Sequence, residues 1–167
     1  MTEIYIEAQA DYLEKLSRTN PVQALSEMIW NSLDADAKHV NIKFLGNEIG
    51  VDQVVISDDG TGFSYDLAIA TFGKLGGSWK RNAGYTNGKR RMHGKEGKGR
   101  FKIFTIGHNV TWEVCYKDNA NYYIYSIKGN SAQLDRFQIN DKKYSNSKKT
   151  GVKVIITNPV KQYKIFD

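Results

Sequence analysis

The chain has 167 residues, of which 40% are hydrophobic and 25% are charged, and its formal net charge is +6. This length supports one domain with a real core, so residues 1–167 are predicted to form a single domain. No apolar run reaches the roughly 18 to 20 residues of a membrane span, which excludes a membrane protein of that kind. The one cysteine, Cys115, excludes an internal disulfide and, with an acidic N-terminus unlike a signal peptide, predicts a cytoplasmic location.

The first 72 residues predict helices interleaved with strands. Pro21, directly after Asn20, is typical of the first turn of a helix. The stretch "HVNIKFL" alternates as a half-buried strand does, and "QVVISDDG" is apolar until it ends in two acids and a glycine. The predicted elements are a strand at 3–7, helices at 9–18 and 21–36, strands at 39–45 and 53–60, and a helix at 64–72.

A long glycine-rich segment, residues 73–99, follows these elements. Nearly a third of its residues are glycine. A loop of this length inside a compact domain is usually a lid or a binding loop, so we expect a long lid here. Beyond it, the sequence predicts a helix start within 99–107 and strands at 109–117, 121–128, 132–139 and 151–157.

The order of these elements predicts the fold class. Turn-forming stretches such as "NANY" and "KGNSA" join the later strands, which favours antiparallel pairing. Helices at the front and a strand meander behind predict an α/β (α+β) two-layer sandwich. Its helices would cover one face of a mixed, mostly antiparallel sheet.

One stripe of the second predicted helix carries polar side chains of an unusual kind. In "SEMIWNSLDADA", residues 26–37, the spacing of Glu27, Asn31 and Asp34 returns each side chain to one face. Asn and Asp are poor residues inside a helix because they compete for backbone hydrogen bonds. Their presence on one stripe therefore indicates a function.

The stretch "SDDGTGF", residues 57–63, places a carboxylate at the end of a buried strand. An ionised carboxylate only accepts hydrogen bonds, so Asp58 would accept one from the exocyclic amino group of adenine and reject guanine. Gly60 and Gly62 would let the backbone approach the purine ring. The alternative is a plain strand-to-helix turn, in which Asp-Gly is common.

A third motif, "HGKEGKGRFKIF", contains Gly94, Gly97 and Gly99 ahead of a predicted helix. Glycine-rich backbone at a helix N-terminus can bind phosphate, because unpaired N–H groups point outward there. The motif is not a Walker A loop, since no G-x-x-x-x-G-K-[ST] pattern occurs. A flexible loop is the alternative interpretation.

Taken together, the three motifs predict a site for a purine triphosphate with Mg²⁺. Magnesium prefers oxygen ligands and retains several waters, and the amide oxygen of Asn31 can supply one ligand. Glu27, one helical turn away, can accept a proton from an attacking water.

The sequence resembles the GHKL superfamily, which includes gyrase B, the ninety-kilodalton heat-shock chaperone, sensor histidine kinases and MutL. The stretch "EMIWNSLDADA" resembles the N-box of its Bergerat fold, which makes Glu27 the general base, Asn31 the magnesium ligand, and Asp34 and Ala35 the closing pair near adenine. "DDGTGF" resembles the D-x-G-x-G box, which makes Asp58 the adenine carboxylate. The resemblance spans roughly residues 20–157 and is closest to the MutL and MORC-like branch.

The resemblance also implies further nucleotide contacts. "GKLGGSWK" resembles the G-x-S-x-K element of the ATP lid and brings Lys80 towards the phosphates. The family often closes with a threonine after a glycine, whereas here Thr150 precedes Gly151; Thr150 is the candidate contact to the phosphates or the pocket floor. "GKEGKGRF" resembles the glycine box, whose phosphate-binding residues are Gly94, Gly97, Lys98, Gly99, Arg100 and Phe101.

The function that this resemblance implies is Mg²⁺-dependent ATP binding and slow ATP hydrolysis. Such domains dimerise when ATP closes the lid, so the chain is expected to be the N-terminal part of a longer homodimeric switch protein. DNA repair and phage defence are the contexts that analogy suggests, with DNA as a partner, ATP and ADP as ligands, and no membrane.

A strongly basic stretch leaves two other interpretations open. Residues 74–102 carry ten lysines and arginines against Glu96 alone, with Trp79, Tyr85 and Phe101 interleaved. This composition is also typical of a nucleic-acid-binding module that uses phosphate contacts and stacking. A non-hydrolysing ATP switch is the third interpretation.

Overall fold

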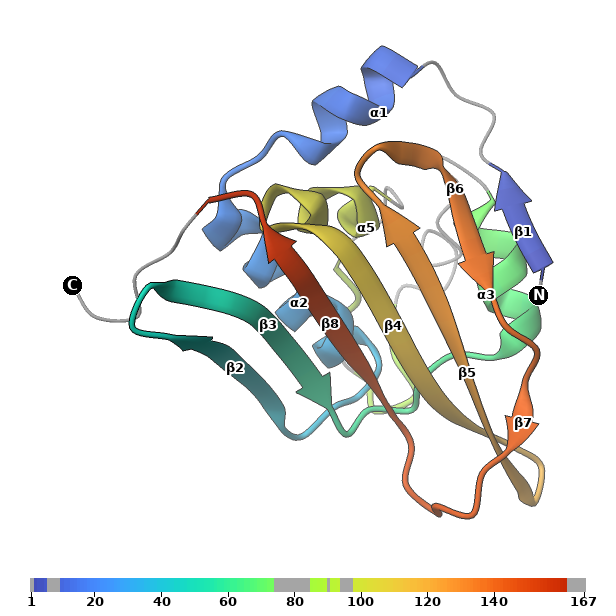
Figure 1. The fold of residues 1–167 in the computed structure, drawn as a ribbon. Coiled ribbons are helices and arrows are strands. Elements are labelled where there is room, and N and C mark those ends of the chain that lie inside the picture. The colour runs from blue at the N-terminus through green and yellow to red at the C-terminus, as the bar shows by residue number, and fades with distance from the viewer. Residues whose placement is uncertain (1, 6–9, 74–84, 90, 94–97, 162–167) are drawn as a thin grey trace.

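The structure, a computed structural model, describes residues 2–5, 10–73, 85–89, 91–93 and 98–161. These residues form an eight-stranded sheet with helices packed on one of its faces (Figure 1). The predicted α/β two-layer class is therefore confirmed. Among the described residues, no helix is long and apolar enough to cross a membrane.

The described helices lie close to their predicted positions. They are α1 (Ala10–Ser17), α2 (Pro21–Asp34), α3 (Tyr65–Phe72) and α5 (Gly99–Lys102), the last continuing into a 3-10 turn, η1 (Ile103–Thr105). The strands are β1 (Thr2–Tyr5), β2 (Val40–Asn47), β3 (Gly50–Asp58), β4 (Gly107–Asp118), β5 (Asn121–Asn130), β6 (Gln133–Ile139), β7 (Lys143–Tyr144) and β8 (Gly151–Pro159).

The sheet order is β1-β6-β5-β4-β8-β3-β2, and β7 pairs with β5. Each pairing among the described strands is antiparallel. The first strand of the chain therefore lies at the edge opposite β2, and β8 returns to the middle between β3 and β4. This return places the start of β8 beside the end of β3, where Asp58 lies.

Local sequence signals account for the ends of α2 and α3. The Asn20 side chain accepts a hydrogen bond from the Val22 N–H at 2.8 Å, and Pro21 begins the helix. Ser64 caps α3 by accepting from the Leu67 N–H at 3.2 Å. Such caps satisfy the backbone donors that the first turn of a helix leaves unpaired.

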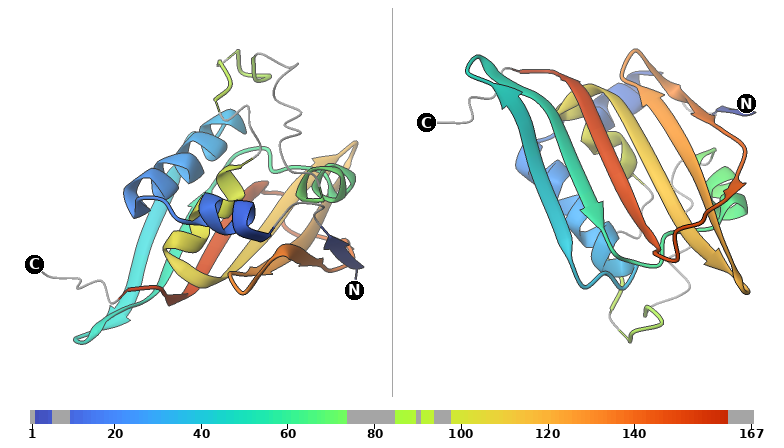
Figure 2. Two further views of the ribbon diagram at one scale, coloured as in Figure 1. Left: turned by 90° about the horizontal axis from the view of Figure 1, so that it is seen from above. Right: turned by 60° about the horizontal axis from the view of Figure 1, so that its bottom comes forward.

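The core lies between the sheet and the helices (Figure 2). Along β4, Val110, Trp112, Val114 and Tyr116 are buried, whereas the residues between them are partly exposed. This alternation means that one face of the sheet packs under the helices and the other is open. The polar stripe of α2 lies at the boundary of this packed layer.

Candidate functional site

The helix α2 presents Glu27, Asn31 and Asp34 along one side, as their spacing predicts. The Glu27 side chain is 28% exposed, whereas that of Asp34 is only 3% exposed. The helix ends at Asp34, and the carbonyl of the next residue, Ala35, accepts a hydrogen bond from the Thr61 N–H at 2.8 Å. This bond joins the end of α2 to the glycine-containing turn after β3.

Asp58, at the end of β3, turns its carboxylate towards α2. Its Oδ2 accepts a hydrogen bond from Ser32 Oγ at 2.8 Å, and its Oδ1 accepts from the N–H groups of Gly60 at 2.9 Å and Val152 at 3.2 Å. Burial raises the pKa of the Asp58 carboxyl above its ordinary value, and these hydrogen bonds partly offset the increase. The carboxylate is thus partly desolvated and held in one orientation.

The neighbouring acid, Asp59, faces the opposite way. Its Oδ1 accepts from the N–H groups of Lys38 at 2.7 Å and His39 at 2.8 Å, and its Oδ2 lies 2.7 Å from His39 Nδ1. The hydrogen bond from the His39 side chain, followed by that from its backbone, holds the pKa of Asp59 well below its ordinary range. Of the two adjacent acids, Asp58 therefore faces α2, whereas Asp59 binds the two residues that precede β2.

The two glycines of this turn are required by close contacts. A Cβ on Gly60 would lie 2.7 Å from the Ala35 carbonyl oxygen. Gly62 has φ +65°, and a Cβ there would lie 2.3 Å from the Cys115 carbonyl oxygen. The turn can therefore approach both α2 and β4 only because neither residue has a side chain.

Thr150 contacts this same turn in spite of its reversed order with Gly151. Its Oγ1 donates a hydrogen bond to the Gly60 carbonyl oxygen at 2.7 Å. The threonine therefore supports the turn that follows Asp58, from the start of β8.

The start of α5 lies against the polar stripe of α2. A Cβ on Gly99 would lie 3.1 Å from Glu27 Oε2 and 3.7 Å from Asn31 Nδ2. Because Gly99 has no side chain, the backbone at the start of α5 comes close to both polar groups. The last residue of α5, Lys102, places its Nζ 2.6 Å from Glu27 Oε1.

The other two side chains of α5 pack on aromatic rings. Phe101 is completely buried and meets Phe137 edge-on, with ring centroids 6.1 Å apart. The Arg100 guanidinium lies 5.5 Å from the Phe72 ring centroid and 4.7 Å from that of Phe101, and burial lowers its pKa to about 10. Phe101 is thus placed to anchor α5 in the core, and its burial leaves it no face for stacking a base.

Part of the predicted lid is described, and it contacts the end of α2. Asp36, at φ +58°, accepts hydrogen bonds from Thr86 Oγ1 at 2.5 Å and the Gly88 N–H at 2.9 Å. The His93 N–H donates to Asp34 Oδ1 at 2.8 Å. These contacts attach residues 85–93, where described, to the same end of α2 as the Asp58 turn.

His93 also stacks on an exposed tryptophan. The rings of Trp30 and His93 have centroids 3.8 Å apart and are inclined by 20°. Trp30 therefore packs against the described part of the predicted lid.

Three predicted contacts, Lys80, Gly94 and Gly97, lie outside the described residues. Lys98 precedes α5 and is partly exposed. The structure thus places two groups of the predicted residues along α2. Gly99 lies against Glu27 and Asn31, and Asp58, Gly60 and Thr150 lie at the C-terminal end of the helix with Asp34 and Ala35.

Three groups at this site are not among those that the sequence predicts: Ser32, the Val152 N–H and Lys102. The Ser32 hydroxyl oxygen lies 3.1 Å from the Met28 carbonyl oxygen and 2.8 Å from Asp58 Oδ2. For Ser32, the sequence does contain a local signal: it is a small hydroxyl residue on the buried side of a helix, beside the polar stripe. The other two depend on contacts between distant segments.

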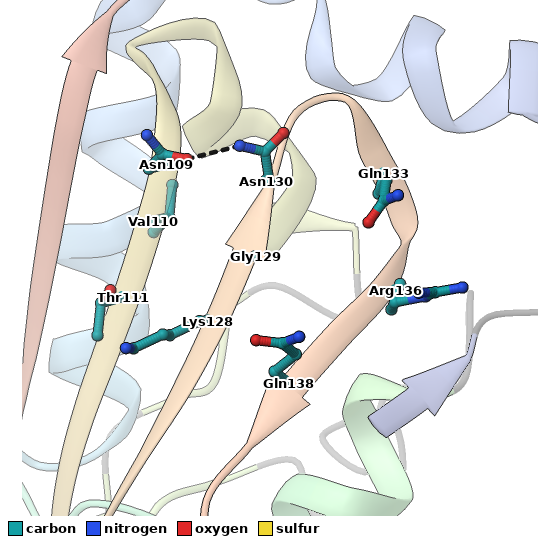
Figure 3. Close-up of a pocket in the computed structure, with 9 residues that line it drawn as sticks. All are labelled: Asn109, Val110, Thr111, Lys128, Gly129, Asn130, Gln133, Arg136 and Gln138. Carbon is teal, nitrogen blue, oxygen red and sulfur yellow. Dashed lines mark hydrogen bonds between the residues drawn. The ribbon is translucent and has the colours of Figure 1, made fainter. Parts of the chain in front are cut away.

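A hollow of about 350 Å³ lies on the open face of the sheet, over β4, β5 and β6 (Figure 3). The pairing of β5 with β6 shifts between Gly129 and Asn130. Figure 3 shows Asn109 and Asn130 joined across its rim by a hydrogen bond of 2.5 Å. Its lining includes none of the predicted nucleotide-binding residues, so this hollow is separate from the candidate site.

Comparison with known families places the chain beside ATP-hydrolysing proteins. The sequence model of a family described as histidine kinase-, DNA gyrase B-, and HSP90-like ATPase matches residues 19–158. This span contains every residue of the candidate site, from Glu27 to Thr150. No curated protein matches the chain.

Proposed function

The chain belongs to the histidine kinase-, DNA gyrase B- and HSP90-like ATPase family, and from this premise we propose that it binds Mg²⁺-ATP at the end of α2 and hydrolyses it slowly. The family implies ATP-hydrolysing activity in general. The residue roles that follow are our proposal for this chain. One arrangement carries it: the partly buried Asp58 carboxylate is hydrogen-bonded to Ser32 of α2, while Gly99 lies against Glu27 and Asn31 of that helix.

Asp58 is proposed to recognise adenine. Three donors from the protein hold its carboxylate, which still has acceptor capacity for a ligand. The exocyclic amino group of adenine donates hydrogen bonds, whereas guanine presents a carbonyl oxygen at the equivalent position. A partly desolvated acceptor favours the donor and rejects the second acceptor, because two acceptors facing each other leave both unsatisfied.

Asn31 is proposed to hold Mg²⁺ through its side-chain oxygen. Magnesium is usually bound by one or two protein groups together with phosphates and waters, and Asn31 beside the bare backbone of Gly99 fits such a site. When bound, the cation neutralises phosphate charge. Asn31 then orients the phosphates without adding negative charge of its own.

Glu27 is proposed to act as the general base. Its Oε2 lies beside Gly99, one of the residues proposed to bind the phosphates. An ionised carboxylate there can accept the proton of an attacking water. Asp34, which is buried and bonded to the His93 N–H, is proposed to position the end of the helix and the lid.

The test of this function is nucleotide binding and turnover by the wild-type chain. We expect calorimetry to show binding of ATP and ADP but not of GTP, and a phosphate-release assay to show slow turnover that requires Mg²⁺. ATP binding without any phosphate release would favour the non-hydrolysing switch. Absence of ATP binding, or equal affinity for GTP, would overturn the proposal.

Replacing Asn31 with alanine is expected to remove the Mg²⁺-dependent part of ATP affinity. The loss should be at least about 10-fold, because even groups that only orient a metal ligand are worth about 10–100-fold. Calorimetry with Mg²⁺ and with a chelator separates the effects: affinity should fall in Mg²⁺ and stay unchanged in chelator.

The matched control is Asn41→Ala, which removes an exposed amide from β2. It should leave both affinities unchanged. If wild-type affinity for ATP is the same with and without Mg²⁺, the assignment of Asn31 is wrong.

The resemblance to GHKL proteins further supports a role as an ATP-driven dimerisation switch in a longer protein, with DNA repair and phage defence as candidate contexts.

A further inference from the structure

Lys102 forms a close ion pair with the residue proposed as general base. Its Nζ lies 2.6 Å from Glu27 Oε1, and the two side chains are 30% and 28% exposed. We propose that Lys102 is a positioning residue, which fixes the orientation of Glu27 and neutralises its charge beside the bound triphosphate. This inference rests on the proposed function of Glu27.

The backbone of α5 determines where Lys102 points. Phe101 is completely buried and Ile103 is also fully buried, so the residues on either side of Lys102 are anchored in the core. Lys102 projects from this anchored turn to α2, although it is separated from Glu27 by 75 residues of sequence. The ion pair therefore joins α2 to a turn whose neighbouring side chains are buried in the core.

The pair assigns different tasks to the two oxygens of Glu27. A lysine ammonium can only donate hydrogen bonds, so Oε1 is engaged by Lys102. Oε2 lies at Gly99, on the side where the phosphates are proposed to bind. Lys102 thus leaves Oε2 as the oxygen that accepts a proton from water.

The charge of Lys102 also matters for ATP binding. A carboxylate and a triphosphate repel each other, and the repulsion is strong in a half-buried site because the local dielectric response is weaker than that of water. A cation in contact with the carboxylate offsets this repulsion. The benefit depends on the charge of Glu27, which makes it testable.

A double-mutant cycle separates this role from direct phosphate binding. We expect Lys102→Met to weaken Mg²⁺-ATP binding about 10-fold in the wild-type background, which is within the coupling observed for contacting charges. In the Glu27→Gln background, where no charge needs neutralising, the same change should weaken binding less than about 2-fold. Lys102→Arg should restore affinity and most of kcat.

Equal weakening in both backgrounds would show that Lys102 binds phosphate directly and would overturn the inference. Unchanged affinity and kcat in Lys102→Met would overturn it as well. Lys102→Gln, closer in polarity to the native residue, replaces the methionine variant if that variant fails to fold by thermal unfolding.

The control is Lys128→Met on the open face of the sheet, which should change neither ATP affinity nor kcat. A wild-type chain that binds no ATP would overturn the proposed function together with this inference. A wild-type chain that binds ATP, combined with additive effects of the two substitutions, would overturn the inference alone.

Discussion

Replacing Glu27 with glutamine is expected to abolish most ATP turnover while preserving ATP binding. Loss of a general base reduces a rate by about 100- to 10,000-fold. Glutamine has nearly the same shape, and its amide oxygen can still accept the hydrogen bond that Lys102 Nζ donates to Glu27 Oε1 at 2.6 Å. Removing a negative charge beside the phosphates should leave ATP affinity equal to that of the wild type or higher.

Single-turnover phosphate release and calorimetry measure the two quantities separately. The matched control is Glu113→Gln, which removes an acid that pairs with Lys153 at 3.5 Å on the open face of the sheet. That variant should hydrolyse ATP at the wild-type rate. Turnover by Glu27→Gln within about 3-fold of wild type, far less than a general base contributes, would show that another group activates the water.

Local periodicity explains why the sequence predicts α2 and its polar stripe. Helical spacing places Glu27 and Asn31 together whatever else the chain does, and Asn20 with Pro21 marks where the helix begins. The turn at Gly60 is predictable for a similar reason, because Asp-Gly after an apolar run marks the end of a strand.

Contacts between distant segments are what the sequence could not predict. The pairing of Lys102 with Glu27, and the stacking of His93 on Trp30, depend on how α5 and the lid segment meet α2. Neither has a periodic signal. The strand β7 has only two residues, which is too short for alternation to show.

Asp58→Asn is expected to weaken ATP binding strongly while leaving the fold intact. The asparagine oxygen can accept from the Gly60 and Val152 N–H groups as Oδ1 of Asp58 does. Its NH₂ group can donate to Ser32 Oγ, because the serine hydroxyl can turn its proton to the Met28 carbonyl oxygen at 3.1 Å. The backbone and Ser32 therefore remain paired.

The adenine contact cannot be kept in the same way. In the variant, the asparagine NH₂ group, a donor, replaces the Oδ2 acceptor of Asp58 and faces the amino group of adenine, which is also a donor. A hydrogen bond to a charged group is worth about 1.5–3 kcal/mol, so ATP affinity should fall by at least about 10- to 150-fold in calorimetry. Asp59→Asn is the matched control: Asp59 faces His39 and Lys38, so this variant should bind ATP as the wild type does. Unchanged affinity in Asp58→Asn would refute the adenine assignment.

The same two variants should change the pH dependence of stability in opposite directions. Burial raises the pKa of Asp58 above its ordinary value of 3.8, so ionising it destabilises the folded state as pH rises from 3.8 through the raised value. Asp58→Asn removes this cost. As pH rises across this interval, the free energy of unfolding of the variant should therefore increase relative to that of the wild type.

Asp59 has a lowered pKa, so its ionised form stabilises the fold above pH 3.8 and this stabilisation is lost as pH falls below that value. Asp59→Asn should therefore be less stable than the wild type at neutral pH, and the difference should shrink in acid. Denaturant unfolding of the nucleotide-free proteins from pH 3 to 7 measures both trends. Parallel curves for Asp58→Asn and the wild type would mean that the Asp58 carboxylate is as well solvated in the folded chain as in the unfolded one, which would remove the physical basis for a selective adenine acceptor at this position.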